Sequence, residues 1–424
     1  MQPGGPRHAR LSVVALICFA LAIAAPAAAQ DPRPEPAPNQ ADPAQPPADT
    51  KDVFDLWREL RHQPPSPPLP STTSMKAFAP VIGTKPSSGL LVGIAGNVAF
   101  YRGDPSTTHI SSAVASVTFS SKKQTSLTDR FAMFGNSDRW RLDADHRLQW
   151  TSLEAVDLGT SADSRDSVQT HFDFVRMHHT AYYRVYDAVY IGAGLYFDNH
   201  FDVRPSEGAE ASWDDSPYVR YSTARGLPLD SQVSAGPSVD ILWDTRDSFI
   251  NAEHGWLAKV SYRTLFDGFL GGDSTWQKLN VDARTYVGLS HDRRHKLAFW
   301  GFVDLVVGGV APYFDLPATG LDTYGRSARG YSEGQFRGEK LAYGEVEYRG
   351  SLMRNGLLGM VAFLNTTTLT NEDSGEQLFD SFAIGGGAGL RLSINKRSKT
   401  NLCLDFGLGK QGSRAVYLAI QEAF

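Results

Sequence analysis

The chain has 424 residues, with 21% charged residues, 11% aromatic residues and 39 glycines, which suffices for two globular domains or one large β-barrel. Its formal net charge is −5 at pH 7, and this acidic excess excludes nucleic acid as a partner, because phosphate binding needs clustered Lys and Arg. Only two cysteines, Cys18 and Cys403, are present, so a disulfide framework is excluded as well.

The N-terminus predicts a secretory signal peptide over residues 1–29. Arg7 and Arg10 precede an apolar run over residues 11–25, and small residues lead to a cleavage site after Ala29. Cleavage removes two arginines and no acidic residue, which changes the net charge from −5 to −7. No later segment holds about 18 consecutive apolar residues, so no transmembrane helix is expected.

Residues 30–51 are rich in Pro, Ala, Asp and Gln and predict a disordered tether, and residues 63–75 predict a second proline-rich spacer. Between them, residues 52–62 predict a short amphipathic helix with an apolar stripe at helical spacing. The stripe consists of Val53, Leu56, Trp57 and Leu60. Two interpretations stay open: the stripe packs on the rim or mouth of the following domain, or it is a docking helix for another protein.

From Lys76 onward the chain predicts strands, because apolar and polar residues alternate between turn signals. The predicted strands cover residues 76–84, 89–101, 109–120, 124–135, 138–152, 171–184, 188–200, 234–247, 255–266, 275–290, 295–308, 338–352, 355–369, 380–394, 400–410 and 415–424. Residues 76–424 are therefore expected to form one all-β domain of sixteen strands.

The position of the charges distinguishes a membrane barrel from a soluble sandwich. Between Trp140 and Trp150, apolar residues at even positions alternate with Arg, Asp and Gln at odd positions, and His146 alone breaks the apolar face. A sandwich core does not accommodate two charges of each sign on one strand face, whereas a water-filled lumen does. We therefore expect an antiparallel transmembrane β-barrel in the outer membrane of a Gram-negative bacterium, surrounded by lipid and lipopolysaccharide, with the short helix in the periplasm.

Connection lengths agree with this topology. If the N-terminus is periplasmic, the long connections 153–170, 201–233 and 309–337 all fall on the extracellular side. Six tryptophans within the predicted strands predict interfacial girdles. They are Trp140, Trp150, Trp243, Trp256, Trp276 and Trp300.

The C-terminus predicts a final strand that runs to the last residue. Val416, Leu418 and Ile420 recur at period two before Phe424, which is expected to be the C-terminal barrel signal. Glu422 departs from this apolar series.

Three motifs carry a family resemblance. They are Asp244-Thr245-Arg246-Asp247 with Gly255; Ala328-Arg329-Gly330-Tyr331 with Gly344-Glu345 and Glu347-Tyr348-Arg349; and the glycine-rich run 385–391 before Leu404-Asp405 and the terminal Ala423-Phe424. With them, residues 234–424 resemble the barrel of the BamA/TamA outer-membrane assembly superfamily, also described as bacterial surface antigen barrels. The first eight strands match only in pattern.

The resemblance implies that the motif Arg329-Gly330-Tyr331 lies on the sixth extracellular loop and that this loop is drawn into the lumen. A partly desolvated arginine needs carboxylate partners on the inner wall. Asp405 is the favoured partner, because it alternates with the apolar Leu404 and Phe406, and the next candidates are Glu345 and Glu347. Asn365 stands where the family often has an acidic residue, so Asp405 is expected to be the carboxylate partner of Arg329 instead.

Transport members of this family carry POTRA domains before the barrel, and residues 30–75 leave no room for one. Two functions remain open. In the first, the seam between the first and last strands opens and a client strand pairs with it, with a separate periplasmic partner. In the second, the chain is a passive pore or a structural barrel plugged by its own loop. Pro80 in the first strand fits a labile seam or an ordinary strand end.

An enzyme, a cofactor and a metal are not expected. Asp244 and Asp247 are interpreted as turn and lumen contacts rather than a catalytic pair. The adjacent His178 and His179 point to opposite faces of a strand, so they cannot form a metal pair there.

Overall fold

The computed structural model describes residues 49–64, 74–85, 88–135, 137–162, 167–289, 294–323 and 325–424. The predicted signal peptide lies outside the described residues, as do residues 30–48 of the predicted tether and 65–73 of the predicted spacer.

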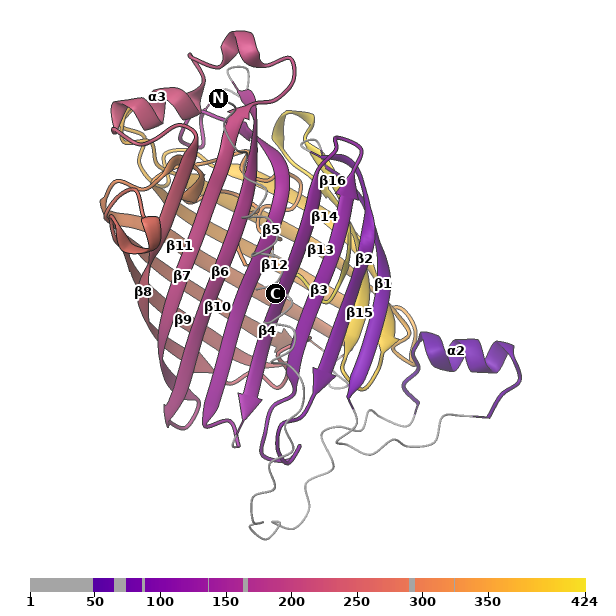
Figure 1. The fold of residues 1–424 in the computed structure, drawn as a ribbon. Coiled ribbons are helices and arrows are strands. Elements are labelled where there is room, and N and C mark those ends of the chain that lie inside the picture. The colour runs from indigo at the N-terminus through magenta and orange to yellow at the C-terminus, as the bar shows by residue number, and fades with distance from the viewer. Residues whose placement is uncertain are drawn as a thin grey trace, which may run out of the picture. The chain divides into compact units, whose positions relative to one another are not determined.

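Sixteen strands form a closed antiparallel barrel in which each strand pairs with its neighbours in sequence, as predicted (Figure 1). They are β1 Met75–Lys85, β2 Gly89–Phe100, β3 Ser111–Ser120, β4 Thr125–Gly135, β5 Trp140–Ala155, β6 Val168–Tyr186, β7 Val189–Pro205, β8 Ser231–Asp244, β9 Gly255–Leu265, β10 Trp276–Gly288, β11 His295–Gly309, β12 Lys340–Ser351, β13 Leu358–Leu369, β14 Ala383–Asn395, β15 Thr400–Leu408 and β16 Arg414–Ile420.

The two ends of the barrel differ in their connections. One end, here the long-loop end, carries the connections 156–167, 206–230 and 310–339, and the opposite end is the short-turn end. At the short-turn end β6 and β7 are joined by two residues, of which Asp187 has a φ of 41°. Such left-handed backbone matches the twist of paired strands in a tight hairpin.

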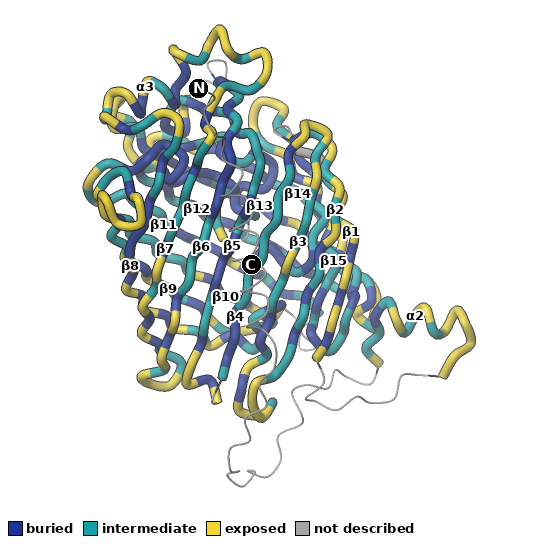
Figure 2. The backbone as a smooth tube through the Cα atoms, viewed as in Figure 1, coloured by how far each residue is buried: buried dark blue, intermediate teal, exposed yellow. Residues whose placement is uncertain are grey.

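Alternation along each strand separates an apolar outer face from a polar inner face. In β5, Trp140 is 52% exposed on the outside, while the next residue, Arg141, is 4% exposed and points inward. Figure 2 shows this alternation of exposed and buried residues along the strands. His146 shares the outer face of β5 but is buried, because Asp129 and His179 on the neighbouring strands contact its ring nitrogens.

Exposed tryptophans form a girdle at the short-turn end, while Trp150, which faces the first residue of β4 near the long-loop end, is partly exposed. Trp140 stacks edge-on with Tyr183, with ring centroids 4.7 Å apart, and Trp243 and Trp256 are exposed on the same rim. The girdle prediction is wrong for Trp276 and Trp300, which are each 3% exposed. These two residues fall on the inner face of their strands, where they pack in the two main apolar clusters of the barrel interior.

The first and last strands meet at a weak seam. Among the residues that the structure describes, a single facing pair, Thr84 and Val416, joins β1 to β16, whereas β15 and β16 face each other from Leu402 to Leu408. Beyond this pair, side chains of β1 and β2 form one apolar cluster with side chains on the outer face of β14 to β16. The cluster contains Ala77, Ala79, Ala95, Ile394 and Ile420, with Val81 and Leu402 against it. The first strand therefore overlaps the last strands over much of its length instead of pairing with them.

The prediction that the final strand runs to Phe424 is wrong. β16 ends at Ile420, and a φ of 75° at Gln421 turns the chain out of the sheet. The physical reason lies in Glu422, whose carboxylate accepts a hydrogen bond of 2.6 Å from Nε of Arg391 on the inner wall.

An aromatic plug fills the barrel at the long-loop end. Tyr218 and Tyr221 of helix α3 (Pro217–Ala224) pack on Tyr313 and Phe314 of the short helix η4 (Tyr313–Asp315). Phe172 and Phe174 of β6 complete the plug, and Phe172 lies 4.5 Å from Phe314 between ring centroids.

One helix precedes the barrel in the described part of the chain. Helix α2 spans Val53–Leu60, and Asp52 caps its first turn together with Asp55 in a capping box. No helix among the described residues is long and apolar enough to cross a membrane.

Candidate functional site

The connection between β11 and β12, residues 310–339, folds into the barrel lumen. Arg147 of β5 donates to the backbone oxygens of Asp322 and Thr323, at 3.0 and 3.2 Å, and Arg130 of β4 donates to Thr323 at 3.0 Å. Both arginines lie on the inner face of their strands, so the loop crosses the lumen to reach them. From here it continues to the strands on the opposite wall.

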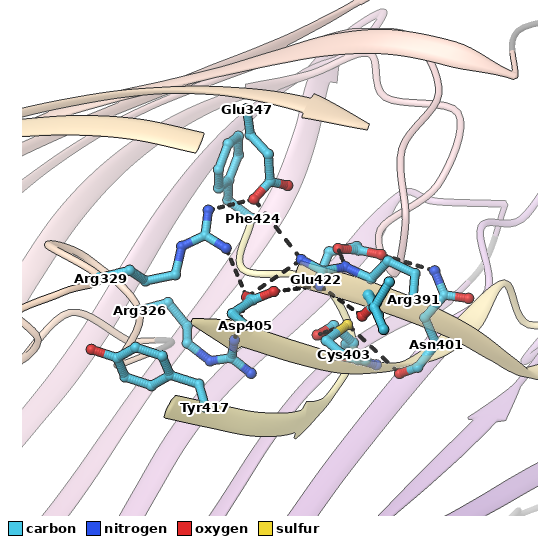
Figure 3. Close-up of polar contacts among 12 residues, drawn as sticks. Arg326, Arg329, Glu347, Arg391, Asn401, Cys403, Asp405, Tyr417, Glu422 and Phe424 are labelled. Atoms are coloured by element: carbon cyan, nitrogen blue, oxygen red, sulfur yellow. Dashed lines mark hydrogen bonds and ion pairs between the residues drawn. The ribbon is translucent and has the colours of Figure 1, made fainter. Parts of the chain in front are cut away.

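Arg329, at the far reach of this loop, has no exposed surface and lies among three carboxylates, of which Figure 3 shows Glu347 and Asp405. Its Nη1 donates to Oδ2 of Asp405 at 2.8 Å, and its Nη2 donates to both Glu345 and Glu347. The plane of the guanidinium lies over the ring of Phe363, 3.7 Å from its centroid. Alternation places Glu345 and Glu347 on the inner face of β12, and Asp405 on that of β15, which is why one guanidinium reaches all three.

Gly330 and Tyr331 join the same loop to the end of β15. Gly330 has a φ of 114°, and a Cβ at this position would lie 2.5 Å from the backbone oxygen of Leu408. Tyr331 Oη donates to the backbone oxygen of Ile384 at 2.6 Å and accepts from the backbone N–H of Lys410 at 3.0 Å. Only glycine fits the first position, and the tyrosine spans β14 and the turn after β15.

Asn365 contacts the loop through a hydrogen-bond donor, whereas an acidic residue at this position would offer an acceptor. Its Nδ2 donates to the backbone oxygen of Arg329 at 3.1 Å. A carboxylate cannot donate this bond, so the amide holds the backbone while Asp405 pairs with the guanidinium.

Sequence reasoning found half of the charge network around Arg329 and missed the other half. Four arginines and four side-chain carboxylates interact there. The arginines are Arg326, Arg329, Arg349 and Arg391, and the carboxylates are Glu345, Glu347, Asp405 and Glu422. The signal was present, since Arg349 and Arg391 fall within the family motifs and Glu422 interrupts an apolar series.

The C-terminal residue belongs to this network too. Phe424 is 6% exposed and packs 5.2 Å from Trp300 between ring centroids, inside the barrel. Arg349 places its guanidinium 4.9 Å from the centroid of the Phe424 ring and donates to the Phe424 backbone oxygen at 2.9 Å.

A second buried arginine, also missed, fixes the base of the loop in the aromatic plug. Arg337 has no exposed surface and donates to the backbone oxygen of Tyr313 at 2.8 Å, with its guanidinium 4.9 Å from the ring centroid of the same residue. Burial lowers the pKa of Arg337. The loop is thus held by one arginine among carboxylates and by another among aromatic rings.

The remaining candidates form separate contacts. Asp244 pairs with Arg246 and Arg141, each at 2.8 Å, and Asp247 accepts from the backbone N–H of Glu253 at 2.8 Å. These are turn and inner-wall contacts at the short-turn end.

The two adjacent histidines lie on opposite faces of β6. His178 faces inward and contacts Asp198 at 2.8 Å, while His179 faces outward and contacts His146 at 2.9 Å.

The predicted helix residues are not brought to the site. Leu56, Trp57 and Leu60 of α2 are 40%, 53% and 69% exposed, and Val53 is partly exposed. The interpretation that this stripe packs on the barrel is therefore wrong, because the polar side of α2 makes the contact with the barrel. Oδ2 of Asp55 pairs with Nζ of Lys396 at 2.7 Å.

Among the described residues, one group brings three possible metal ligands together. Ligand atoms of His171, Asp173 and Asp202 lie within 4.8 Å of one another near the long-loop end. Asp202 is exposed and already pairs with Arg204 at 3.3 Å, so the group resembles an ordinary surface ion cluster.

Comparison with known proteins places this geometry in context. The family model of the Omp85 superfamily domain matches residues 115–396. BamA from Haemophilus ducreyi lacking POTRA domains 1–3 is 13% identical with a TM-score of 0.52, over 82% of this chain and 70% of that chain. CdiB from Acinetobacter baumannii is 10% identical with a TM-score of 0.53, over 82% and 59%.

CdiB from Escherichia coli is 12% identical with a TM-score of 0.53, over 84% of this chain and 63% of that chain. This chain thus covers less than two thirds of the length of either CdiB. No curated protein matches the sequence.

Proposed function

Because this chain belongs to the Omp85 superfamily, we propose that it inserts or exports client proteins through the seam between β1 and β16. The chain is an outer-membrane protein of a Gram-negative bacterium. The clients and partners of BamA and CdiB are not assigned to this chain, because the sequences are only 10–13% identical.

The seam is the observation that supports this function. With one pair of facing residues, Thr84 and Val416, opening breaks few backbone hydrogen bonds, each worth about 1 kcal/mol net. The 11 residues of β1 then offer a strand edge to which an unpaired client strand can add. Pro80 within β1 leaves one fewer ladder donor at this edge.

The inserted loop has a complementary role in this proposal. Arg329, Gly330 and Tyr331 join the loop to β12, β14 and β15, so we assign them to a lock that keeps the C-terminal strands rigid while β1 moves. Asp405, Glu345, Glu347 and Asn365 are the inner-wall side of the lock. Client capture falls to a separate periplasmic partner, since the described part of the chain contains no globular domain besides the barrel.

The aromatic plug favours a second candidate, a structural barrel closed by its own loop. The cavity below the plug has a volume of about 200 Å³ and is lined by paired charges such as Arg176 with Asp198 and Lys278 with Asp304. In this case the protein would have low conductance in a planar bilayer and no effect on other barrels.

Locking the seam with a disulfide distinguishes the two candidates. In a Cys403→Ala background, Thr84→Cys with Val416→Cys joins the pair of residues that face each other across the described part of the seam. We expect a strain that depends on this variant to lose other outer-membrane barrels under oxidising conditions and to recover them with a reductant. The readout is the outer-membrane proteome after depletion of the wild-type protein.

The matched control uses the same position on β16. Phe406→Cys with Val416→Cys joins β15 to β16, which face each other at these residues in the closed sheet. This variant should support the proteome under both conditions. The assembly function is wrong if the variant with the locked seam also maintains the outer-membrane proteome, or if depletion changes only solute permeability. Either result favours the structural barrel.

A further inference from the structure

Helix α2 presents an apolar face that nothing in the described part of the chain covers. At 100° per residue, Val53, Leu56, Trp57 and Leu60 fall within one continuous sector, and Phe54 extends its edge. Phe54 and Trp57 are each 53% exposed and Leu60 is 69% exposed. Four large apolar side chains on eight residues need a covering surface in water.

The opposite face of α2 is attached to the rim of the barrel. Oδ2 of Asp55 pairs with Nζ of Lys396 at 2.7 Å, and Oδ2 of Asp52 accepts from the backbone N–H of Lys396 at 3.2 Å. Lys396 follows β14 directly, in the turn to β15. Just before the helix, the backbone N–H of Lys51 donates to Asn355 at 2.9 Å, in the turn between β12 and β13.

These two attachments place α2 at the level of the membrane surface. Both turns belong to the short-turn end, where Trp140, Trp243 and Trp256 form the exposed girdle. Trp side chains concentrate at membrane–water interfaces, so this rim lies at the headgroup level of one leaflet. Figure 1 shows α2 beside the short-turn ends of the strands, directed away from the sheet.

Residues around α2 match a membrane surface better than a protein partner. Leu352 and Met353, in the turn that binds Lys51, are 51% and 44% exposed and add apolar surface to the same rim. Arg61 lies over the ring of Trp57, 4.3 Å from its centroid, as cations and aromatic rings do at headgroups. A stable protein interface buries about 800 Å² on each partner, more than four half-exposed side chains provide.

We propose that α2 lies in the inner leaflet of the outer membrane, with its apolar face among the acyl chains and its polar face on the barrel rim. The helix then anchors the N-terminal segment to the membrane beside β14, two strands from the seam. This inference rests on the outer-membrane location and the position of α2, and it holds whether or not the barrel assembles clients.

Spin labels on the full chain in vesicles of phosphatidylethanolamine and phosphatidylglycerol test the immersion. Leu60→Cys places the label on the apolar face, and Glu59→Cys, about 100° around the helix, places it towards the polar side. Cys18 is replaced by serine, and Cys403 is fully buried and stays unlabelled in the folded barrel. We expect the label at 60 to be accessible to oxygen and protected from a water-soluble nickel complex, while the label at 59 is accessible to nickel.

Equal nickel access at both positions would overturn the proposal. So would protection at position 60 that requires an added periplasmic protein fraction, because a protein would then be the covering surface.

A second variant separates immersion from folding. In a Trp57→Cys labelled chain, Leu60→Glu should restore nickel access and leave the heat resistance of the barrel unchanged, since Leu60 makes no part of the sheet. If the label at 57 remains protected from nickel in this variant, the bilayer is not what covers the helix.

Discussion

At the scale of residues, the buried charge of Arg329 is compensated by three carboxylates whose side chains have no exposed surface, and Arg329 compensates their charges in turn. Removing one partner of a buried ion pair costs about 3–5 kcal/mol, because the other partner keeps an uncompensated charge. We expect Arg329→Ala to form the sheet but to unfold at a clearly lower temperature when heated samples are compared on gels.

The control for this prediction is an arginine in a solvent-exposed pair. Arg220 pairs with Asp157 in the long-loop region, with side chains 50% and 39% exposed. Exposed pairs contribute about 0–1 kcal/mol, so Arg220→Ala should change the unfolding temperature little. A shift for Arg329→Ala no larger than that of Arg220→Ala would show that the inserted loop is not locked by charge.

At the scale of elements, the four residues after β16 form a hook that ends with Phe424 inside the barrel. Truncation of a buried Phe costs about 3–5 kcal/mol, while a volume-conserving change usually costs less than about 1.5 kcal/mol. In detergent, Phe424→Ala should therefore lower the urea midpoint of unfolding strongly, and Phe424→Leu only slightly.

The same two variants test the proposed role of Phe424 as the C-terminal barrel signal. If the aromatic ring is recognised before folding, both variants reduce the amount of the barrel in the outer membrane. If Phe424→Leu reaches the membrane in wild-type amounts, Phe424 acts only through its packing in the folded barrel and not as a recognition signal.

At the scale of the whole molecule, the aromatic plug encloses an acidic residue between the loop and the wall. Asp315 is 8% exposed, and burial together with the nearby Asp198 raises its pKa to about 7. Its Oδ2 accepts from Ser234, while Oδ1 lies 3.8 Å from Nδ1 of His200. The folded chain thus keeps this proton up to about pH 7, whereas the unfolded chain releases it near the ordinary value of 3.8.

The sign of the pH effect follows from proton binding. Between these two pKa values the folded state holds the extra proton, so the contribution of Asp315 to stability falls as pH rises and is constant above about 7. Asp315→Asn removes this contribution, so its advantage over wild type in the urea midpoint should grow from pH 5 to pH 8. A difference that stays constant over this range would mean that Asp315 is ionised in the folded barrel.

The sequence by itself determined the barrel. Period-two alternation of apolar and charged residues, sixteen runs and the order of long and short connections follow from local chain geometry, and the strand count is confirmed. The motif around Arg329 could be chosen in advance from the family resemblance, and its acidic candidates from alternation, which decides which side chains face inward. Asp405 and Glu345 required no knowledge of distances.

Only the tertiary structure decided what those inward side chains meet. The turn at Gln421 that ends β16, the partnership of Glu422 with Arg391, and the enclosure of Arg337 by aromatic rings all join residues far apart in the chain. Pro80 allowed a labile seam as one of two readings, and only the structure shows how few residues pair there, since pairing between the first and last strands depends on how the whole sheet closes. The local pattern decides whether a residue faces inward or outward, and closure of the barrel decides which residues it contacts.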